Sequence, residues 1–267
     1  MTSNKFFSFL THAAAGAALT FAALGAQAAE TLKVYGPGGP APAMKEAALA
    51  FETTHGIKVE VTAGPTPAWL EKAKQDADLI FSGSETMMTD LVYAMGDQLD
   101  HRDVEPLYLR PLSILVRPSN PRKISGFKDL LKPGLKVLVV NGAGQNGVWE
   151  DAAGRKGDIA SVKALRNNID VYAKNSAEAK KAWIDKPEID AWLIWNIWQV
   201  ESPQLADAVP VEQEYAIYRD TGIAITRRAK TEAQASRFVE FLKSKEGAAI
   251  FAKWGWQTQT GRTSGRK

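Results

Sequence analysis

Short runs of hydrophobic residues alternate along the chain with longer segments in which hydrophobic positions recur every three or four residues. The short runs predict β-strands and the longer segments predict amphipathic helices. In the helix expected after Tyr35, for example, Met44, Ala47 and Phe51 share one face, and Gly56 supplies a left-handed cap at its end. The pattern predicts strands over 32–35, 58–62, 78–81, 136–140, 169–173 and 189–195, and helices over 69–74, 149–153, 159–166, 176–184 and 246–254, with further helices around Met88 and Phe238.

Repeated β-turn-α units of this kind predict an α/β fold built on a mainly parallel sheet with helices on its faces. Two segments depart from the repeat. Residues 107–116 form a long β-like run that contains Pro111, which a central strand would not accept, so we expect a bent segment that crosses between two lobes. Residues 209–226 are again β-rich and would return the chain to the first lobe.

This layout predicts two lobes with a cleft between them, the arrangement of hinge-closing binding proteins. The expected divisions are a discontinuous lobe one over 29–112 plus 222–257, lobe two over 113–221, and a disordered polar tail over 258–267. Each lobe is expected to be a mainly parallel sheet flanked by helices.

The first 28 residues have the features of a secretory signal peptide. Lys5 precedes an apolar stretch over about 13–24, and Ala26-Gln27-Ala28 has the small-x-small pattern of a cleavage site. An N-terminal membrane anchor is the alternative, but the apolar stretch is shorter than the roughly 20 residues that a spanning helix needs. The sequence therefore predicts a periplasmic protein.

Composition argues against several classes of function. The chain has no cysteine, and its net charge of +3 comes from acids and bases that are mixed along the sequence, so a clustered nucleic-acid footprint is not expected. Its three histidines, His12, His55 and His101, stand far apart, and no G-x-S-x-G motif occurs, so neither a catalytic triad nor a metal site is indicated. We expect no enzyme activity and no cofactor.

Two glycine-rich turns, at 36–40 and 141–147, each follow a predicted strand and precede a predicted helix. Such a turn directs free backbone N–H groups and the positive end of a helix dipole at one spot, which suits an anion. The second turn also matches the G-x-G-x-x-G dinucleotide fingerprint, but Asp170 lies 28 residues beyond Gly142 rather than about 20. An anion site, a nucleotide site and a tight turn without a ligand all stay open for it.

Ligands of such sheets bind beyond the carboxyl ends of the strands. The residues expected there are Gly38, Gly39, Pro40, Thr66, Ser82, Ser84, Gly144, Gln145, Asn146, Gly147, Trp195 and Asn196. Arg110 and Arg219 lie in the two crossing segments and could pair with an anionic group, whereas Arg117 and Arg155 are expected to pair with surface acids. Any of these arginines could instead belong to a structural ion pair, and the hydroxyl groups could simply cap helices.

Five sequence strings resemble a known family. They are YGPGGP (35–40), AGPTPAW (63–69), DADLIFSGSE (76–85), PLYLRP (106–111) and NGAGQNGVWEDAAGRKGDI (141–159). They are similar to the accessory colonisation factor AcfC group, which belongs to the class II periplasmic solute-binding proteins, akin to the sulfate and molybdate binders. The resemblance implies two α/β lobes, a cleft, no catalysis, and capture of a small anionic solute such as an oxyanion or a phosphorylated or carboxylated metabolite.

The expected function is therefore capture of an anion for an ABC permease or for a chemoreceptor in chemotaxis, by a protein that could also form a homodimer. Two alternatives stay open. One is a surface adhesin or interaction protein, and the other is an enzyme that uses a nucleotide.

Overall fold

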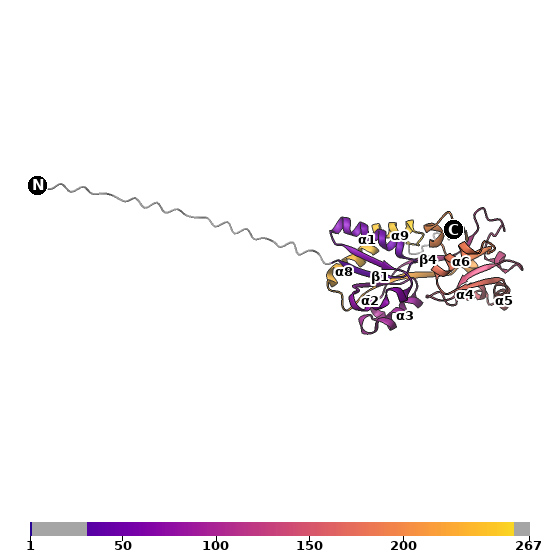
Figure 1. Ribbon diagram of the computed structural model, residues 1–267. Coiled ribbons are helices and arrows are strands. Elements are labelled where there is room, and N and C mark those ends of the chain that lie inside the picture. The colour runs from indigo at the N-terminus through magenta and orange to yellow at the C-terminus, as the bar shows by residue number, and fades with distance from the viewer. Residues whose placement is uncertain (2–30, 259–267) are drawn as a thin grey trace, which may run out of the picture.

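The computed structural model describes Met1 and residues 31–258 (Figure 1). The predicted signal peptide and nearly all of the predicted tail therefore lie outside the described residues. Gln257, just before that tail, is part of the fold, because its N–H donates to the Leu109 carbonyl oxygen at 2.7 Å. Within the described residues, none of the helices is both long and apolar enough to cross a membrane.

A nine-stranded mixed sheet runs through the molecule, in the order β2-β1-β3-β9-β4-β7-β5-β6, with β8 paired to β4. The strands are β1 (Leu32–Gly36), β2 (Val59–Ala63), β3 (Leu79–Phe81), β4 (Glu105–Val116), β5 (Val137–Val140), β6 (Ile169–Ala173), β7 (Ala191–Trp195), β8 (Asp207–Pro210) and β9 (Tyr218–Ile225). Pairing is parallel within β2-β1-β3 and within β7-β5-β6, and antiparallel wherever β4 or β9 takes part. The α/β prediction is confirmed.

The longer helices are α1 (Ala41–His55), α3 (Glu85–Met95), α5 (Ile159–Asn168), α6 (Ser176–Asp185), α8 (Glu232–Lys243) and α9 (Lys245–Lys253). Shorter ones are α2 (Leu70–Asp76), α4 (Val148–Gly154) and α7 (Ile197–Glu201). Most begin or end within two or three residues of the predicted boundaries. Gly56 has φ of 66°, and its N–H bonds to the Glu52 carbonyl oxygen, so the expected left-handed cap of α1 is confirmed.

The buried side chains divide the molecule into two halves. One cluster takes its buried residues only from 112–217, and we call this part the second half. Two clusters built from 32–108 and 223–256 form the first half, one on each face of its sheet. In β1, Val34 belongs to the cluster that contains residues of α1, α8 and α9, while the next residue, Tyr35, belongs to the cluster with α2 and α3, as the alternation of a strand requires. Figure 1 shows α1 and α9 on one side of this part of the sheet and α2 and α3 on the other.

Strand β4 links the halves without a break. Its residues 105–111 pair with β9, and its residues 112–116 pair with β7 and β8. Pro111 is the last residue of β4 that pairs with β9, and Leu112 is the first that pairs with β7. The missing N–H of Pro111 therefore interrupts neither the β4–β9 nor the β4–β7 hydrogen-bond ladder. The expectation that Pro111 would exclude a continuous central strand was wrong, because the change of partners supplies the position that a proline tolerates.

Candidate functional site

A cavity of about 140 Å³ lies between the halves, and both contribute to its wall. The first half lines it with Pro37, Gly38, Gly39, Pro40, Gly64, Pro65, Thr66, Gly83, Met87 and Arg110, and the second half with Ala143, Gln145, Asn175, Ser176, Ala177, Trp195 and Trp198. Most of these residues come from turns that follow β1, β2, β3, β5, β6 and β7, where a parallel sheet places its ligands. The cavity has about the size of a site that holds a benzene-sized molecule.

Arg110 projects into this cavity from the point where β4 changes partners. Its side chain is 4% exposed, and its guanidinium carbon lies 4.7 Å from the Trp195 ring centroid and 5.2 Å from that of Trp256. Trp195 belongs to the second half and Trp256 to the first, so the cation is held between rings from both.

The guanidinium has few hydrogen-bond partners. One N–H of Nη2 donates to the Gly83 carbonyl oxygen, but Nε and Nη1 find no partner among the described residues. Burial lowers the pKa of Arg110 to about 9, and the negative charge of Asp220 opposes that shift. The side chain is therefore a buried cation at neutral pH with unused donors at the wall of a cavity.

Two indole groups add further donors. Trp195 and Trp198 line the cavity, and neither indole N–H has a hydrogen-bond partner within the part of the chain that the structure describes. An unpaired buried N–H costs about 1–3 kcal/mol, so groups of this kind mark places where an acceptor can bind. The cavity thus combines apolar walls with a small number of donors, which is typical of small-molecule sites.

The first glycine turn brings the backbone against Arg110. A Cβ atom on Gly39 would lie 2.6 Å from Nη1 of Arg110, and one on Gly83 would lie 3.0 Å from Nη2. A side chain at Gly39 would displace the guanidinium, so glycine is required there by close approach. Helix α1 begins directly after Pro40, which places its positive end at this wall.

In the second glycine turn, only one of the four residues expected at the site, Gln145, lines the cavity. Ala143 and Gln145 line the cavity, and the Gln145 amide donates to the Ser176 hydroxyl at 3.0 Å. Gly144 faces the first half instead, and Gly147 has φ of 76° at the N-cap of α4, a helix of only seven residues. Packing explains these glycines without a nucleotide.

The other expected site residues lie outside the cavity wall. Ser82 is fully buried, and its hydroxyl accepts from the Gly222 N–H at 3.1 Å. Ser84 caps α3, Asn146 is exposed, and the Asn196 amide donates to the Gly255 carbonyl oxygen at 2.7 Å. Arg219 forms an ion pair with Asp151 at 2.9 Å, which is the structural role left open for it.

Some lining residues were not expected, among them Met87, Trp198 and the stretch from Asn175 to Ala177. The last of these follows β6 and begins α6, so the rule that places ligands at strand ends would have found it. Trp198 belongs to α7 and lies close in sequence to Trp192 and Trp195, and no local signal in the sequence marks it as a residue that lines the cavity.

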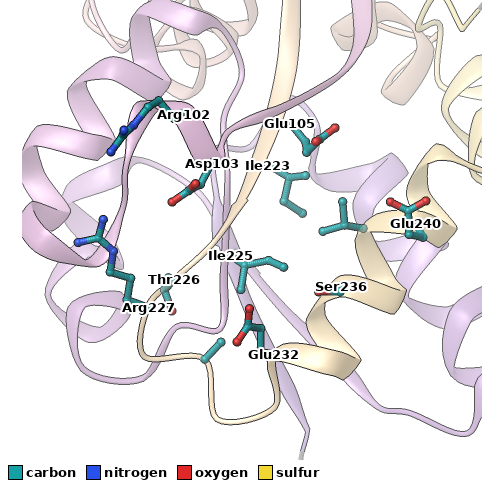
Figure 2. Close-up of a pocket in the computed structure, with 12 residues that line it drawn as sticks. Arg102, Asp103, Glu105, Ile223, Ile225, Thr226, Arg227, Glu232, Ser236 and Glu240 are labelled. Atoms are coloured by element: carbon teal, nitrogen blue, oxygen red, sulfur yellow. The ribbon is translucent and has the colours of Figure 1, made fainter.

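A larger hollow of about 650 Å³ lies elsewhere, between the start of β4, the end of β9 and α8 (Figure 2). Charged side chains of both signs surround it, and several of them are paired with one another or with neighbouring residues. Arg102 and Arg227 pair with Asp100, and Lys243 pairs with Glu105 and Glu240. Within the described residues, this hollow has no buried, unpaired cation in its wall, whereas the smaller cavity has Arg110.

No group of three His, Asp or Glu side chains that could hold a metal ion occurs within residues 31–258.

Comparisons with known proteins agree with this architecture. The model of the family described as bacterial extracellular solute-binding protein matches residues 32–257. The crystal structure of PEB3 with bound L-phospholactate is 36% identical, with a TM-score of 0.80 over 85% of this chain and all of that chain, and Peb3 from Campylobacter jejuni superposes with a TM-score of 0.79. The sulfate-binding protein SubI from Mycobacterium tuberculosis, at 17% identity and a TM-score of 0.69 over 85% of this chain and 86% of that chain, shares the fold.

Among curated proteins, the sulfate-binding protein of Salmonella typhimurium is 23% identical over 171 residues, which are 55% of this chain and about half the length of that relative. The family consists of binding proteins rather than enzymes, and these structural relatives have the two-lobed fold of class II periplasmic binding proteins. The chain therefore belongs to the bacterial extracellular solute-binding protein family.

Proposed function

We propose that this protein captures a small anionic solute in the cavity between its halves and presents it, in the periplasm, to an ABC permease or a chemoreceptor. The two lobes would be 29–112 plus 222–257 and 113–221, and both would contact the solute. The observation that carries the proposal is Arg110, a buried cation at the cavity wall whose Nε and Nη1 have no partner among the described residues.

The energetic argument concerns the cost of that buried charge. A cation removed from water is expensive unless an opposite charge and hydrogen bonds compensate it. Asp220 lies near enough to affect the pKa of Arg110, but no carboxylate of the described chain is within salt-bridge distance of the guanidinium. An anion with two or more acceptor oxygens would satisfy both the charge and the free donors.

The size of the cavity and the ligands of the relatives limit the range of candidate solutes. About 140 Å³ suits an inorganic oxyanion or a carboxylated or phosphorylated molecule of a few carbons, and it is too small for a dinucleotide. A sulfate-binding protein and a PEB3 structure with L-phospholactate are among the relatives. We also propose, from the five sequence strings, that the chain belongs to the accessory colonisation factor AcfC group. A homodimer stays a prediction.

Thermal unfolding of the ligand-stripped protein tests the proposal. The panel is sulfate, molybdate, phosphate, L-phospholactate, phosphoglycerate, citrate, amino acids and NAD, at one ionic strength. A ligand at 100 times its Kd adds about 2.7 kcal/mol to the free energy of unfolding, which gives a clear shift in Tm. We expect at least one of the anions to produce that shift.

The variant Arg110→Met provides the control, because the shift should disappear with it while the protein stays folded. Stabilisation by NAD alone would replace the proposal with a nucleotide-using protein. No stabilisation by any member of the panel would remove the anion-binding function.

A further inference from the structure

A direct contact joins the halves beside the cavity. The Ser84 hydroxyl donates to the Gly144 carbonyl oxygen at 3.1 Å, across 60 residues of sequence. Ser84 begins α3 in the first half and is 2% exposed, whereas Gly144 belongs to the glycine turn of the second half. The bond is thus shielded from water at a boundary between two units that have separate cores.

The turn that carries Gly144 is firmly held by the second half. The Gln145 N–H closes it by donating to the Gly142 carbonyl oxygen at 2.9 Å, and its two central residues are left-handed, with φ of 48° at Ala143 and 75° at Gly144. A Cβ atom on Gly142 would lie 2.4 Å from the Lys174 carbonyl oxygen, so the turn packs tightly against the neighbouring loop.

The tip of this turn fits closely against α3. A Cβ atom on Gly144 would lie 2.7 Å from the Cβ atom of Met87 and 3.0 Å from the Ser84 hydroxyl oxygen. The two residues that flank Gly144, Ala143 and Gln145, line the cavity. The position of the tip against α3 therefore fixes where the second half's wall stands relative to Arg110.

A second contact of the same kind lies at another point of the boundary. The Asn196 amide, in the second half, donates at 2.7 Å to the carbonyl oxygen of Gly255, in the first half. Gly255 is also left-handed, with φ of 81°, and a Cβ atom there would lie 2.5 Å from the Asn196 amide nitrogen. In both contacts a polar side chain of one half binds a glycine carbonyl of the other.

We propose that Ser84 is a positioning residue, whose hydroxyl stabilises the closed arrangement of the two halves before any solute binds. The inference rests on the proposed function in so far as closure serves capture of a solute. The contact itself needs no ligand, since both partners belong to the chain. A protein that is already partly closed binds its solute more tightly, because less of the binding free energy is used to convert open molecules into closed ones.

The test measures closure of the ligand-free protein. The chain has no cysteine, so Glu52→Cys on α1 and Glu178→Cys on α6 place one dye on each half at exposed positions. Ser84→Gly removes the hydroxyl but leaves an acceptable N-cap residue at α3, since glycine costs only a few tenths of a kcal/mol there. Single-molecule energy transfer then reports the ratio of closed to open molecules.

The matched control is Ser244→Gly. Ser244 caps α9 by accepting from the Gly247 N–H at 3.2 Å, the same geometry as Ser84 with Met87, and it lies within the first half. We expect Ser84→Gly to lower the closed-to-open ratio roughly fivefold, the effect of one ordinary hydrogen bond, and Ser244→Gly to leave it unchanged.

An unchanged ratio in Ser84→Gly, or an equal fall in both variants, would overturn the inference. A solute identified by the panel should lose affinity in Ser84→Gly by the same factor as the measured fraction of closed molecules. A panel without any hit would remove the proposed function but not the energy-transfer result, so the two failures are distinguishable.

Discussion

Two arginines, one within β4 and one directly after it, use the same guanidinium chemistry in opposite ways. Arg110 and Arg117 both stand on or next to β4, seven residues apart, and both guanidinium groups stack on a tryptophan, Arg110 on Trp195 and Arg117 on Trp183. Arg117 donates to the carbonyl oxygens of Ile189, Trp183 and Lys186 at 2.8, 2.9 and 2.6 Å. Arg110 donates only to that of Gly83.

The difference separates a structural arginine from a binding one. Arg117 is satisfied by the chain, so its removal should damage the fold and leave ligand binding intact. Arg110 retains unused donors beside a cavity, so its removal should abolish binding and relieve the fold of an uncompensated charge. Residue type and stacking on a tryptophan are the same in both cases, whereas Arg110 is the more deeply buried of the two and has fewer hydrogen-bond partners.

The variant with the largest expected effect is Arg110→Met, which tests whether Arg110 binds the solute. We expect the affinity for the anion found in the panel to fall about a hundredfold, because a charge-assisted hydrogen bond is worth about 1.5–3 kcal/mol. The free energy of unfolding of the ligand-free variant should be unchanged or higher, because an apolar side chain of similar volume replaces a buried cation. Calorimetric titration and urea unfolding measure the two effects, and retained affinity would exclude Arg110 from the site.

Arg117→Met should show the reverse. Three carbonyl oxygens lose their donor, so we expect the free energy of unfolding to fall by about 2 kcal/mol. Affinity for the same anion, measured at a temperature where the variant is folded, should stay within about twofold of the original. A large loss of affinity without loss of stability would erase the distinction between the two arginines.

Gly39→Ala tests whether binding depends on the close approach of the Gly39 backbone to Arg110. Its new methyl group would lie 2.6 Å from Nη1 of Arg110, so the guanidinium must move, and we expect about tenfold weaker binding. Gly38→Ala is the matched variant, since its methyl group would meet Trp198 at an ordinary 3.8 Å and the loss should be well under tenfold. Neither glycine has a left-handed φ, so backbone strain does not enter. Equal losses in both would show that the turn as a whole, and not Arg110, is disturbed.

The pH dependence of binding gives the smallest effect. Burial lowers the pKa of Arg110 to about 9 in the free protein, and a bound anion favours the protonated form, so it raises that pKa. Affinity should therefore be constant from pH 7 to 8 and should decline as pH rises through 9, by about fourfold at pH 9.5. The decline should be absent in Arg110→Met, and a profile that is flat to pH 10 in the original protein would contradict this assignment.

The sequence predicted most of the elements because each depends on local patterns. The strand over 169–173 matches β6, and the helix over 159–166 falls within α5. The continuous strand β4 could not be foreseen, since acceptance of Pro111 depends on where its neighbours β9 and β7 end, which is a property of the whole sheet.

Part of the cavity wall could be predicted from local patterns as well. The rule that ligands bind at strand ends led to Gly39, Gln145 and Trp195, and the expectation of crossing segments led to Arg110. All four line the cavity. The strand-end rule could not tell which residues of a turn face inward, so it included Ser82, whose hydroxyl has a partner within the chain. Arg219 was included because of its crossing segment, although it forms an ion pair with Asp151. Inward orientation depends on packing between halves, and local sequence does not encode it.

The two halves also differ in how much of the chain each core needs. The second half draws its buried residues from one continuous stretch, 112–217, whereas the main core of the first half combines residues near the start with Phe238, Phe251 and Trp256 near the end. During synthesis from the N-terminus, the second half can acquire its core while α8 and α9 are still missing. The first half can complete its main core only when these last helices are available, so its hydrophobic strands stay exposed for longer than those of the second half.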